Sequence, residues 1–238
     1  GRVVDHRTYQ ISQMANVDFY LESLMTPETL NDFGADHIAI ATGAKWKKDG
    51  IGRQNPLGID IAVGAKILSP DDIMAGIELN DPVVVFDDDH FYMGGAIAEK
   101  LCRDGCEVTL VTPAAEVSSW THNTLDQHAV QKQLMELGVR VVTTHNLSAI
   151  RSNAVDLSCV YTETIKTLDC AATVLVTMRQ PVDDLWQACP DLIRIGDALG
   201  PSTIAAAVHS GHLFARELGV SNPGNVPFRR ELINLSLT

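Results

Sequence analysis

A run of apolar residues, Val83–Phe86, stands near the middle of the chain and is followed by a polar turn and an apolar-periodic segment near 92–104. An uninterrupted apolar run of this length predicts a strand that is buried on both faces of a parallel sheet. Two more strands are expected at 107–111 and 139–143, with a helix near 124–137 between them. The alternation of strands and helices predicts an α/β fold for this part of the chain.

Shorter patterns follow and precede this region. Segments 146–150, 154–161 and 164–169 alternate between apolar and polar positions, which predicts a meander of short strands. The segment 171–176 reads as one more buried strand. Residues 44–68 show no clear period and predict a long irregular loop, which in a compact domain is usually functional or a crossover.

The two ends of the chain predict pieces of another α/β unit. A helix is expected within residues 1–16, and 17–22 alternates like a strand. Thr26-Pro27-Glu28 predicts a helix start, because a hydroxyl cap precedes a proline at the first helical position. Near the other end, a strand that closes on Gly196-Asp197 precedes a helix expected from Pro201 to Leu218.

The fold class is therefore predicted as α/β, with a Rossmann-like βαβ domain inserted into parts of a second α/β domain. The inserted domain is 81–178, the partial domain is 1–80 with 190–238, and 179–189 is a polar connection. No strand–glycine-turn–helix unit begins the partial domain, which would leave it without its central strand. An exposed sheet edge is expected in 1–80, and such an edge tends to recruit another chain.

The amino-acid composition and net charge disfavour several classes of binding partner. The formal net charge is −12, which disfavours nucleic acid and anionic membrane surfaces, because both require clustered cations. No apolar run approaches the roughly 20 residues of a membrane span. The five cysteines form no CxxC pair, so we expect reduced, buried thiols in a cytoplasmic protein and no iron–sulfur or other metal ligand.

The turn after the central strand carries the most informative chemistry. A dinucleotide-binding unit has G-x-G-x-x-G at this place, so that the backbone can approach a pyrophosphate. Here the turn holds Asp87, Asp88 and Asp89, and three carboxylates would repel a phosphate and fill its approach. We therefore expect no NAD(P) at Asp87–Gly95. A cation site is disfavoured, since three consecutive residues do not all face one ion, and a helix cap with solvent exposure is the expected role.

Other candidate groups are weaker. Ser118, His122 and His128 lie in no G-x-S-x-G elbow, which argues against a hydrolase. His209 and His212 have a spacing that zinc can use, but no third ligand is evident.

Several segments together resemble one known family. This family is the trimethylamine and dimethylamine dehydrogenases. The segments on which the resemblance rests are Gly34-Ala35-Asp36-His37, Ala41-Thr42-Gly43-Ala44-Lys45-Trp46, the strand and turn 83–93, Ile195-Gly196-Asp197-Ala198 and Val226-Pro227-Phe228-Arg229-Arg230. The resemblance covers essentially the whole chain. It implies a C-terminal region built like the paired nucleotide-binding domains of flavoprotein disulfide reductases. The inserted domain would then be of the NAD(P)-binding type, and the partial second domain of the FAD/ADP-binding type.

The resemblance also implies cofactors and partners. Members of that family have an N-terminal barrel with FMN and the catalytic residues, and a 4Fe-4S cluster after it. The C-terminal region holds ADP in the amine dehydrogenases and FAD in relatives that reduce enoyl thioesters. The chain is then expected to contain no catalytic residue, to be inactive alone, and to bind ADP poorly without the missing phosphate loop. Its expected partners are the barrel of the same polypeptide, an electron-transfer flavoprotein and further copies in a homo-oligomer.

Two segments are the candidate cofactor-binding residues. Ala41, Thr42 and Gly43 end a buried strand and are expected beside an adenine nucleotide, or else form a tight strand exit. Gly196 and Asp197 would meet the ribityl chain and phosphates of FAD. Where only ADP is held, Asp197 is expected to cap the helix that begins near Pro201.

Three functions remain open at this point. The first is an ADP-type structural module of an amine dehydrogenase-like oxidoreductase. The second is part of an NAD(P)H-dependent FMN, FAD and iron–sulfur reductase of the enoate or dienoyl thioester type. The third is a stand-alone nucleotide-binding module.

Overall fold

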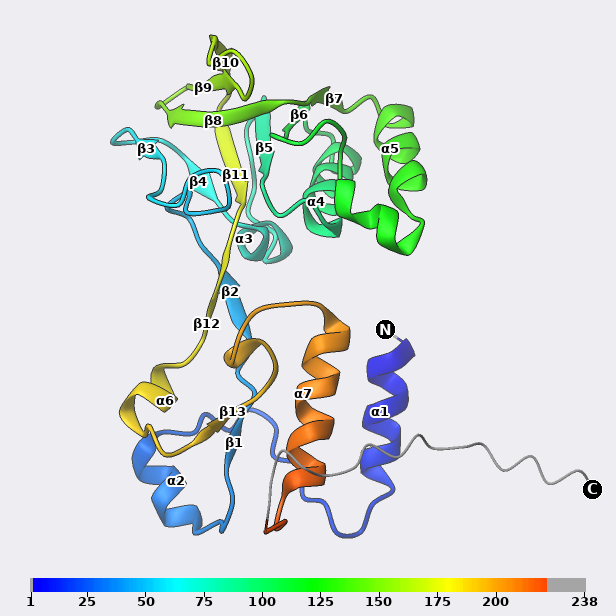
Figure 1. Ribbon diagram of the computed structural model, residues 1–238, viewed down its shortest axis with the longest axis vertical. Coiled ribbons are helices and arrows are strands. Elements are labelled where there is room, and N and C mark those ends of the chain that lie inside the picture. Colours follow the sequence, from blue (N-terminus) through cyan, green and yellow to red (C-terminus); the bar gives the residue numbers. More distant parts are fainter. Residues whose placement is uncertain (1, 222–238) are drawn as a thin grey trace, which may run out of the picture. The chain divides into compact units, whose positions relative to one another are not determined.

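A computed structural model describes residues 2–221 of the chain (Figure 1). These residues form two compact units. One consists of residues 2–40 with 183–193, and the other of 41–182 with the described residues from 194 onward. The larger unit thus begins and ends outside the expected 81–178, because the segments on both sides of that range also pack within it.

A five-stranded parallel sheet forms the centre of the larger unit, with the order β4-β11-β5-β6-β7. Its strands are β4 (Ile67–Leu68), β5 (Val83–Asp87), β6 (Val108–Val111), β7 (Arg140–Val142) and β11 (Ala172–Val176). Val85 of β5 lies opposite Val174 on one side and Leu110 on the other. The central position of β5 confirms the interpretation of its apolar run.

Side chains of β5 point alternately into two cores. Val83 and Val85 belong to a core with Ile97 and Leu101 of helix α4 (Tyr92–Arg103) and Leu134 of α5 (Gln127–Glu136). Val84 and Phe86 belong to a second core that includes residues of the meander. All five residues of β5 are buried, since both faces of the sheet are covered. This is why the run shows no polar alternation.

The predicted meander of three strands is present, and one additional strand pairs with it. β8 (His145–Ile150), β9 (Ala154–Cys159) and β10 (Ile165–Asp169) pair antiparallel in sequence, and β3 (Asp60–Ile61) joins β8 in parallel. Short strands within 44–68 escaped the sequence analysis. Two-residue strands such as β3 and β4 are held by pairing with distant neighbours and leave no period of their own.

Another strand pair corrects the expected connection 179–189. β12 (Arg179–Pro181) pairs antiparallel with β2 (Ala44–Trp46), and the short helix α6 (Asp184–Ala188) follows. A three-residue strand that contains proline has no readable pattern, so only its partner identifies it. The helix α3 (Pro70–Met74) completes the elements before β5.

The smaller unit contains α1 (Arg2–Ser12), α2 (Pro27–Phe33) and a two-stranded sheet of β1 (Ala39–Ile40) and β13 (Ile193–Arg194). The start of α2 is confirmed, with Thr26 as N-cap, and Gly34 ends the helix at φ +68°. The strand expected at 17–22 is wrong. These residues form turns and coil, because alternation alone does not make a strand without a neighbour to pair with.

Much of the smaller unit's apolar surface is exposed. Its buried apolar side chains are Leu30 and Ile40, as far as the described residues show. Those that are exposed come from α1, α2 and the segment between them: Val4, Tyr9, Ile11, Met14, Val17, Phe19, Tyr20, Leu21, Leu24 and Phe33. Within residues 2–221, β1 pairs with β13 alone, so the expected open sheet edge is present.

The last described helix is α7 (Ile204–Glu217), followed by Gly219 at φ +73°. Thr203 is its N-cap and accepts a hydrogen bond from the Ala206 N–H, so the helix begins three residues after the expected Pro201. The tail interpreted as an extended arm lies almost wholly in 222–238, outside the described residues. Among the helices described, none has the length and apolar character needed to cross a membrane.

Candidate functional site

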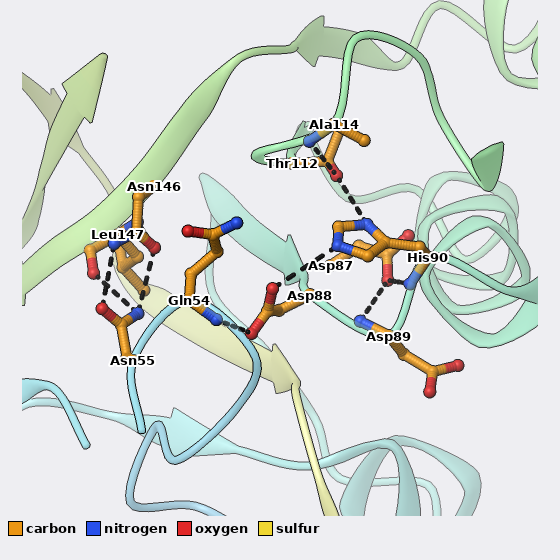
Figure 2. Close-up of polar contacts among 10 residues, drawn as sticks. All are labelled: Gln54, Asn55, Asp87, Asp88, Asp89, His90, Thr112, Ala114, Asn146 and Leu147. Carbon is orange, nitrogen blue, oxygen red and sulfur yellow. Dashed lines mark hydrogen bonds and ion pairs between the residues drawn. The ribbon is translucent and has the colours of Figure 1, made fainter. Parts of the chain in front are cut away.

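Two of the three carboxylates in the turn after β5 point inward. Asp87 and Asp88 are fully buried, and Asp89 is half-buried. Asp87 Oδ1 accepts hydrogen bonds from the backbone N–H groups of Asp89 (3.2 Å) and His90 (3.0 Å), as Figure 2 shows. His90 closes the turn at φ +63°. The carboxylate thus satisfies the backbone of its own turn.

The other oxygen of Asp87 has an apolar neighbour. Asp87 Oδ2 is buried and has no hydrogen-bond partner among the described residues. It lies against Gly94 in the first turn of α4, where an added Cβ would stand 2.5 Å from Oδ2 and 2.3 Å from Cγ. Burial raises the pKa of Asp87 from 3.8 to about 7, against the opposing effect of His90. Gly94 is therefore required by the inward position of Asp87.

Asp88 is held by a loop from the earlier part of the chain. Its Oδ2 accepts a hydrogen bond from the Gln54 N–H at 3.0 Å, and its Oδ1 lies 3.5 Å from His90 Nε2. A Cβ on Gly52 would stand 2.4 Å from Asp88 Oδ2, so this loop packs directly on the carboxylate. The loop covers the turn that faces the phosphates in a dinucleotide-binding unit.

The same loop is fixed at a second point. Asn55 and Asn146 of β8 exchange side-chain hydrogen bonds of 3.0 and 2.9 Å, and Asn55 also donates to the Leu147 carbonyl (Figure 2). His90 Nδ1 lies 3.4 Å from Thr112 Oγ1. Polar contacts from β8 therefore hold the loop, and Thr112, which directly follows β6, contacts the turn at His90.

The expected role of Asp87–Asp89 as an exposed helix cap is wrong. The N-cap position of α4 is Phe91, which makes no side-chain cap hydrogen bond. Three consecutive acidic residues predict a solvated turn, because isolated carboxylates are rarely buried. The two glycines that admit them, Gly52 and Gly94, are the signal that could have placed these carboxylates inside.

A cavity of about 660 Å³ lies in the larger unit, on the side of the sheet where β5 and β11 end. Its lining includes Arg53, Asp89, Trp120, Thr177 and Arg179. The Arg53 guanidinium stands 4.2 Å from the centre of the Trp120 ring. Burial raises the pKa of Asp89, and the charges of Arg179 and Arg53 oppose that rise. Ligands prefer this end of a parallel sheet.

The candidate residue Thr42 is tied to the chain after β12. Its hydroxyl donates to the Val182 carbonyl, and the Val182 N–H donates to the Gly43 carbonyl at 2.9 Å. Gly43 has φ +77° and open space where a side chain would stand. Ala41 is exposed. The strand-exit interpretation accounts for these contacts.

Asp197 is tied to the other end of the same strand. Its Oδ2 accepts a hydrogen bond from Arg179 Nη1 at 2.8 Å, and its Oδ1 accepts one from the Ser202 N–H at 3.1 Å. Arg179 also donates to the Ser202 carbonyl. Asp197 therefore orders the turn that precedes α7. The expectation that Asp197 caps this helix is wrong, since Thr203 is the N-cap. Gly196, at φ +59°, donates its N–H to Ser210 Oγ.

The structure thus joins the two predicted segments through β12, and adds cavity residues that the sequence analysis missed. Arg53 lies in a loop, Trp120 in a short 3-10 helix (Ser119–Thr124), Thr177 directly after β11 and Arg179 at the start of β12, and the end of β11 was the available signal for Thr177. The weaker candidates stay separate. His122 pairs with Glu116, whereas Ser118 Oγ is buried without a described partner. No group of three metal-ligating side chains is present in the described part.

Comparisons with known proteins agree with this architecture. A family model described as the OYE-like second alpha/beta domain matches residues 68–175. Histamine dehydrogenase from Rhizobium sp. 4-9 is 42% identical, with a TM-score of 0.91, over 99% of this chain and 39% of its own. The 6-hydroxypseudooxynicotine amine oxidase from Pseudomonas geniculata N1 is 37% identical, with a TM-score of 0.85, over 89% of this chain and 33% of its own.

Dimethylamine dehydrogenase from Hyphomicrobium sp. (strain x) is 27% identical over 95% of this chain and 36% of its own length. The chain therefore spans little more than a third of these relatives. Thioredoxin reductase from T. acidophilum, at 12% identity and a TM-score of 0.52, shares the fold alone. The α/β fold of FAD- and NAD-binding reductases and these relatives support the assignment of the chain to the trimethylamine/dimethylamine dehydrogenase-like family.

Proposed function

We propose that this chain is the C-terminal nucleotide-holding module of an amine dehydrogenase-type oxidoreductase. In this proposal the module binds an ADP-type nucleotide and stabilises the assembled enzyme. Amine oxidation takes place in a barrel of the same polypeptide, which carries FMN and a 4Fe-4S cluster. Histamine dehydrogenase, dimethylamine dehydrogenase and the 6-hydroxypseudooxynicotine amine oxidase each match this chain over about a third of their own length, and this supports the assignment.

The observation that carries the proposal is the covered turn at Asp87–His90. A pyrophosphate needs a glycine-rich turn whose backbone N–H groups face it. Here the N–H groups of Asp89 and His90 are already used by Asp87, and the Gln54 loop lies on Asp88. The turn offers a phosphate neither donors nor space. This favours a structural role over an NAD(P)H-dependent reductase.

The candidate residues fit an ADP-type ligand better than FAD. The open space at Gly43 leaves backbone accessible beside a nucleotide. Each oxygen of Asp197 already accepts a hydrogen bond, from Arg179 and Ser202, and this gives the carboxylate a structural role that does not require a ribityl chain. When bound, ADP would supply binding energy to the fold and no redox chemistry. Ala41, Thr42, Gly43 and Gly196 would line its site.

Titration of the full-length protein by calorimetry tests this function. We expect ADP to bind, and NADH and NADPH to give no heat in the low micromolar range, because the covered turn excludes their phosphates. Binding of either reduced coenzyme in that range would establish the reductase alternative. A coding sequence without a barrel and a cysteine cluster upstream of Gly1 would instead favour the stand-alone module.

The exposed apolar side chains of the smaller unit support the proposal that another part of the same polypeptide binds there. Ten large apolar residues are exposed over residues 4–33, which is a high density for a surface that remains in water. We propose that the rest of the polypeptide, and a second copy in a homo-oligomer, cover this surface and the open edge of β1.

An electron-transfer flavoprotein is the proposed redox partner, on the basis of the net charge of −12. Attraction between an acidic surface and a basic partner weakens with ionic strength. The rate at which the reduced enzyme reduces this acceptor is therefore expected to fall as salt is added. A rate that does not change with salt would remove the electrostatic basis of the proposal.

A further inference from the structure

The segment 17–22 has the sequence pattern of a strand and the conformation of coil. Val17, Phe19 and Leu21 occupy every second position, and valine, phenylalanine and tyrosine all favour strands. In the structure the segment forms turns and coil, and the side chains of Val17, Phe19 and Leu21 are 40%, 65% and 72% exposed. The described residues therefore bury no face that this alternation would serve.

The backbone of the segment is unpaired as well. From residue 18 to residue 24, no N–H group donates to another backbone group of the described chain, and no carbonyl accepts a backbone N–H. A row of free backbone groups beside alternating apolar side chains is the surface that an added strand uses, since main-chain hydrogen bonds and side-chain contacts form together.

The rest of the smaller unit is prepared for a larger sheet. β1 pairs with β13 alone in residues 2–221, and a sheet of two short strands is marginally stable by itself. The Tyr20 ring meets the Phe33 ring of α2 edge to face, with 6.3 Å between their centres. The segment thus already lies against a helix of its unit, whereas none of the described strands pairs with it.

We propose that segment 17–22 is a strand in the full-length protein, and that it pairs with a strand of the same polypeptide outside residues 1–238. This rests on the proposed function only in placing the chain within a longer polypeptide, and it requires no nucleotide. The relatives leave room for such a strand, since the chain matches 39% of histamine dehydrogenase and 36% of dimethylamine dehydrogenase.

A second copy of the chain is a poor partner for this segment. Antiparallel pairing of two copies about Tyr20 would set Asp18 of one copy opposite Glu22 of the other, twice over. Parallel pairing in register would set each carboxylate opposite its own copy. Like charges directly opposite each other destabilise a strand pair. The occupant is therefore a strand of different sequence.

Lysine substitutions in the full-length protein test the strand, because its side chains alternate between two faces. Phe19→Lys and Leu21→Lys should each lower the melting temperature by about 5 °C or more, since both put a charge on the apolar face. Asp18→Lys and Glu22→Lys should lower it by about 2 °C at most. Leu57→Lys is the matched control, because Leu57 lies in a loop of the larger unit and is 97% exposed.

A photoreactive phenylalanine analogue in place of Phe19 identifies the partner. In a mixture of ¹⁴N- and ¹⁵N-labelled full-length protein, we expect it to cross-link to a peptide outside residues 1–238 of the same copy. Cross-links between differently labelled copies would overturn the proposal, and so would equal effects of lysine at positions 18, 19, 21 and 22. If the alternation is found and ADP does not bind, the proposed nucleotide function fails and the strand stands.

Discussion

Gly94→Ala is expected to lower the free energy of unfolding by about 3 kcal/mol, at the upper end of the usual cost of overpacking a core. The new Cβ would stand 2.3 Å from Asp87 Cγ and 2.6 Å from Asp87 Cβ, which is closer than non-bonded carbon atoms approach. Asp87 is at the end of a central strand and is completely buried, so it has little room to retreat. Urea denaturation followed by circular dichroism measures the change.

Gly211→Ala is the matched control, since Gly211 lies inside α7 and nothing stands within 4 Å of the position of its Cβ. There alanine should stabilise the protein by up to about 1 kcal/mol through its higher helix propensity. Similar effects of the two substitutions would show that the inward position of Asp87 does not depend on Gly94.

The second large effect is a loss of stability as the pH rises through neutrality. Burial raises the pKa of Asp87 from 3.8 to about 7. The folded state therefore keeps a proton that the unfolded state has released between these two values. By linkage, the contribution of Asp87 is fully present below about pH 4, falls as the pH rises, and is lost above about pH 7. A difference of three pKa units corresponds to on the order of 4 kcal/mol.

Asp87→Asn isolates this contribution from that of other titrating groups. The amide oxygen can accept the N–H groups of Asp89 and His90, and the side chain no longer titrates. The difference in unfolding free energy between the variant and the parent should favour the variant increasingly from pH 5 to pH 8. A difference that is constant over this range would contradict a raised pKa for Asp87.

The sequence patterns predicted the larger unit well where local signals and burial agree. The run Val83–Phe86, the strands of the meander and the cap at Thr26 were all found where they were expected. Each of these elements is encoded locally, either by residues adjacent in the chain or by the spacing of apolar residues that a buried face requires. The strand expected at 17–22 failed, because it met the local pattern without a partner strand.

The candidate site was predicted less well, because its geometry depends on residues far apart in the chain. Asp88 is held by Gln54, 34 residues earlier, and Asp197 by Arg179, 18 residues earlier. Thr177 becomes a cavity residue only when the loop with Arg53 and the start of α7 are placed around it. No period or motif in a single segment records such contacts.

The alternation of β5 between two cores has a consequence for how the protein can change over time. Side chains at 83 and 85 pack with α4 and α5, whereas those at 84 and 86 pack with the meander. The two cores form separate clusters, and substitutions that share no packing partners usually have additive effects. Substitutions in the core with α4 and α5 can therefore accumulate independently of those in the core with the meander. The condition is that each residue of β5 keeps its side chain on the same face of the sheet.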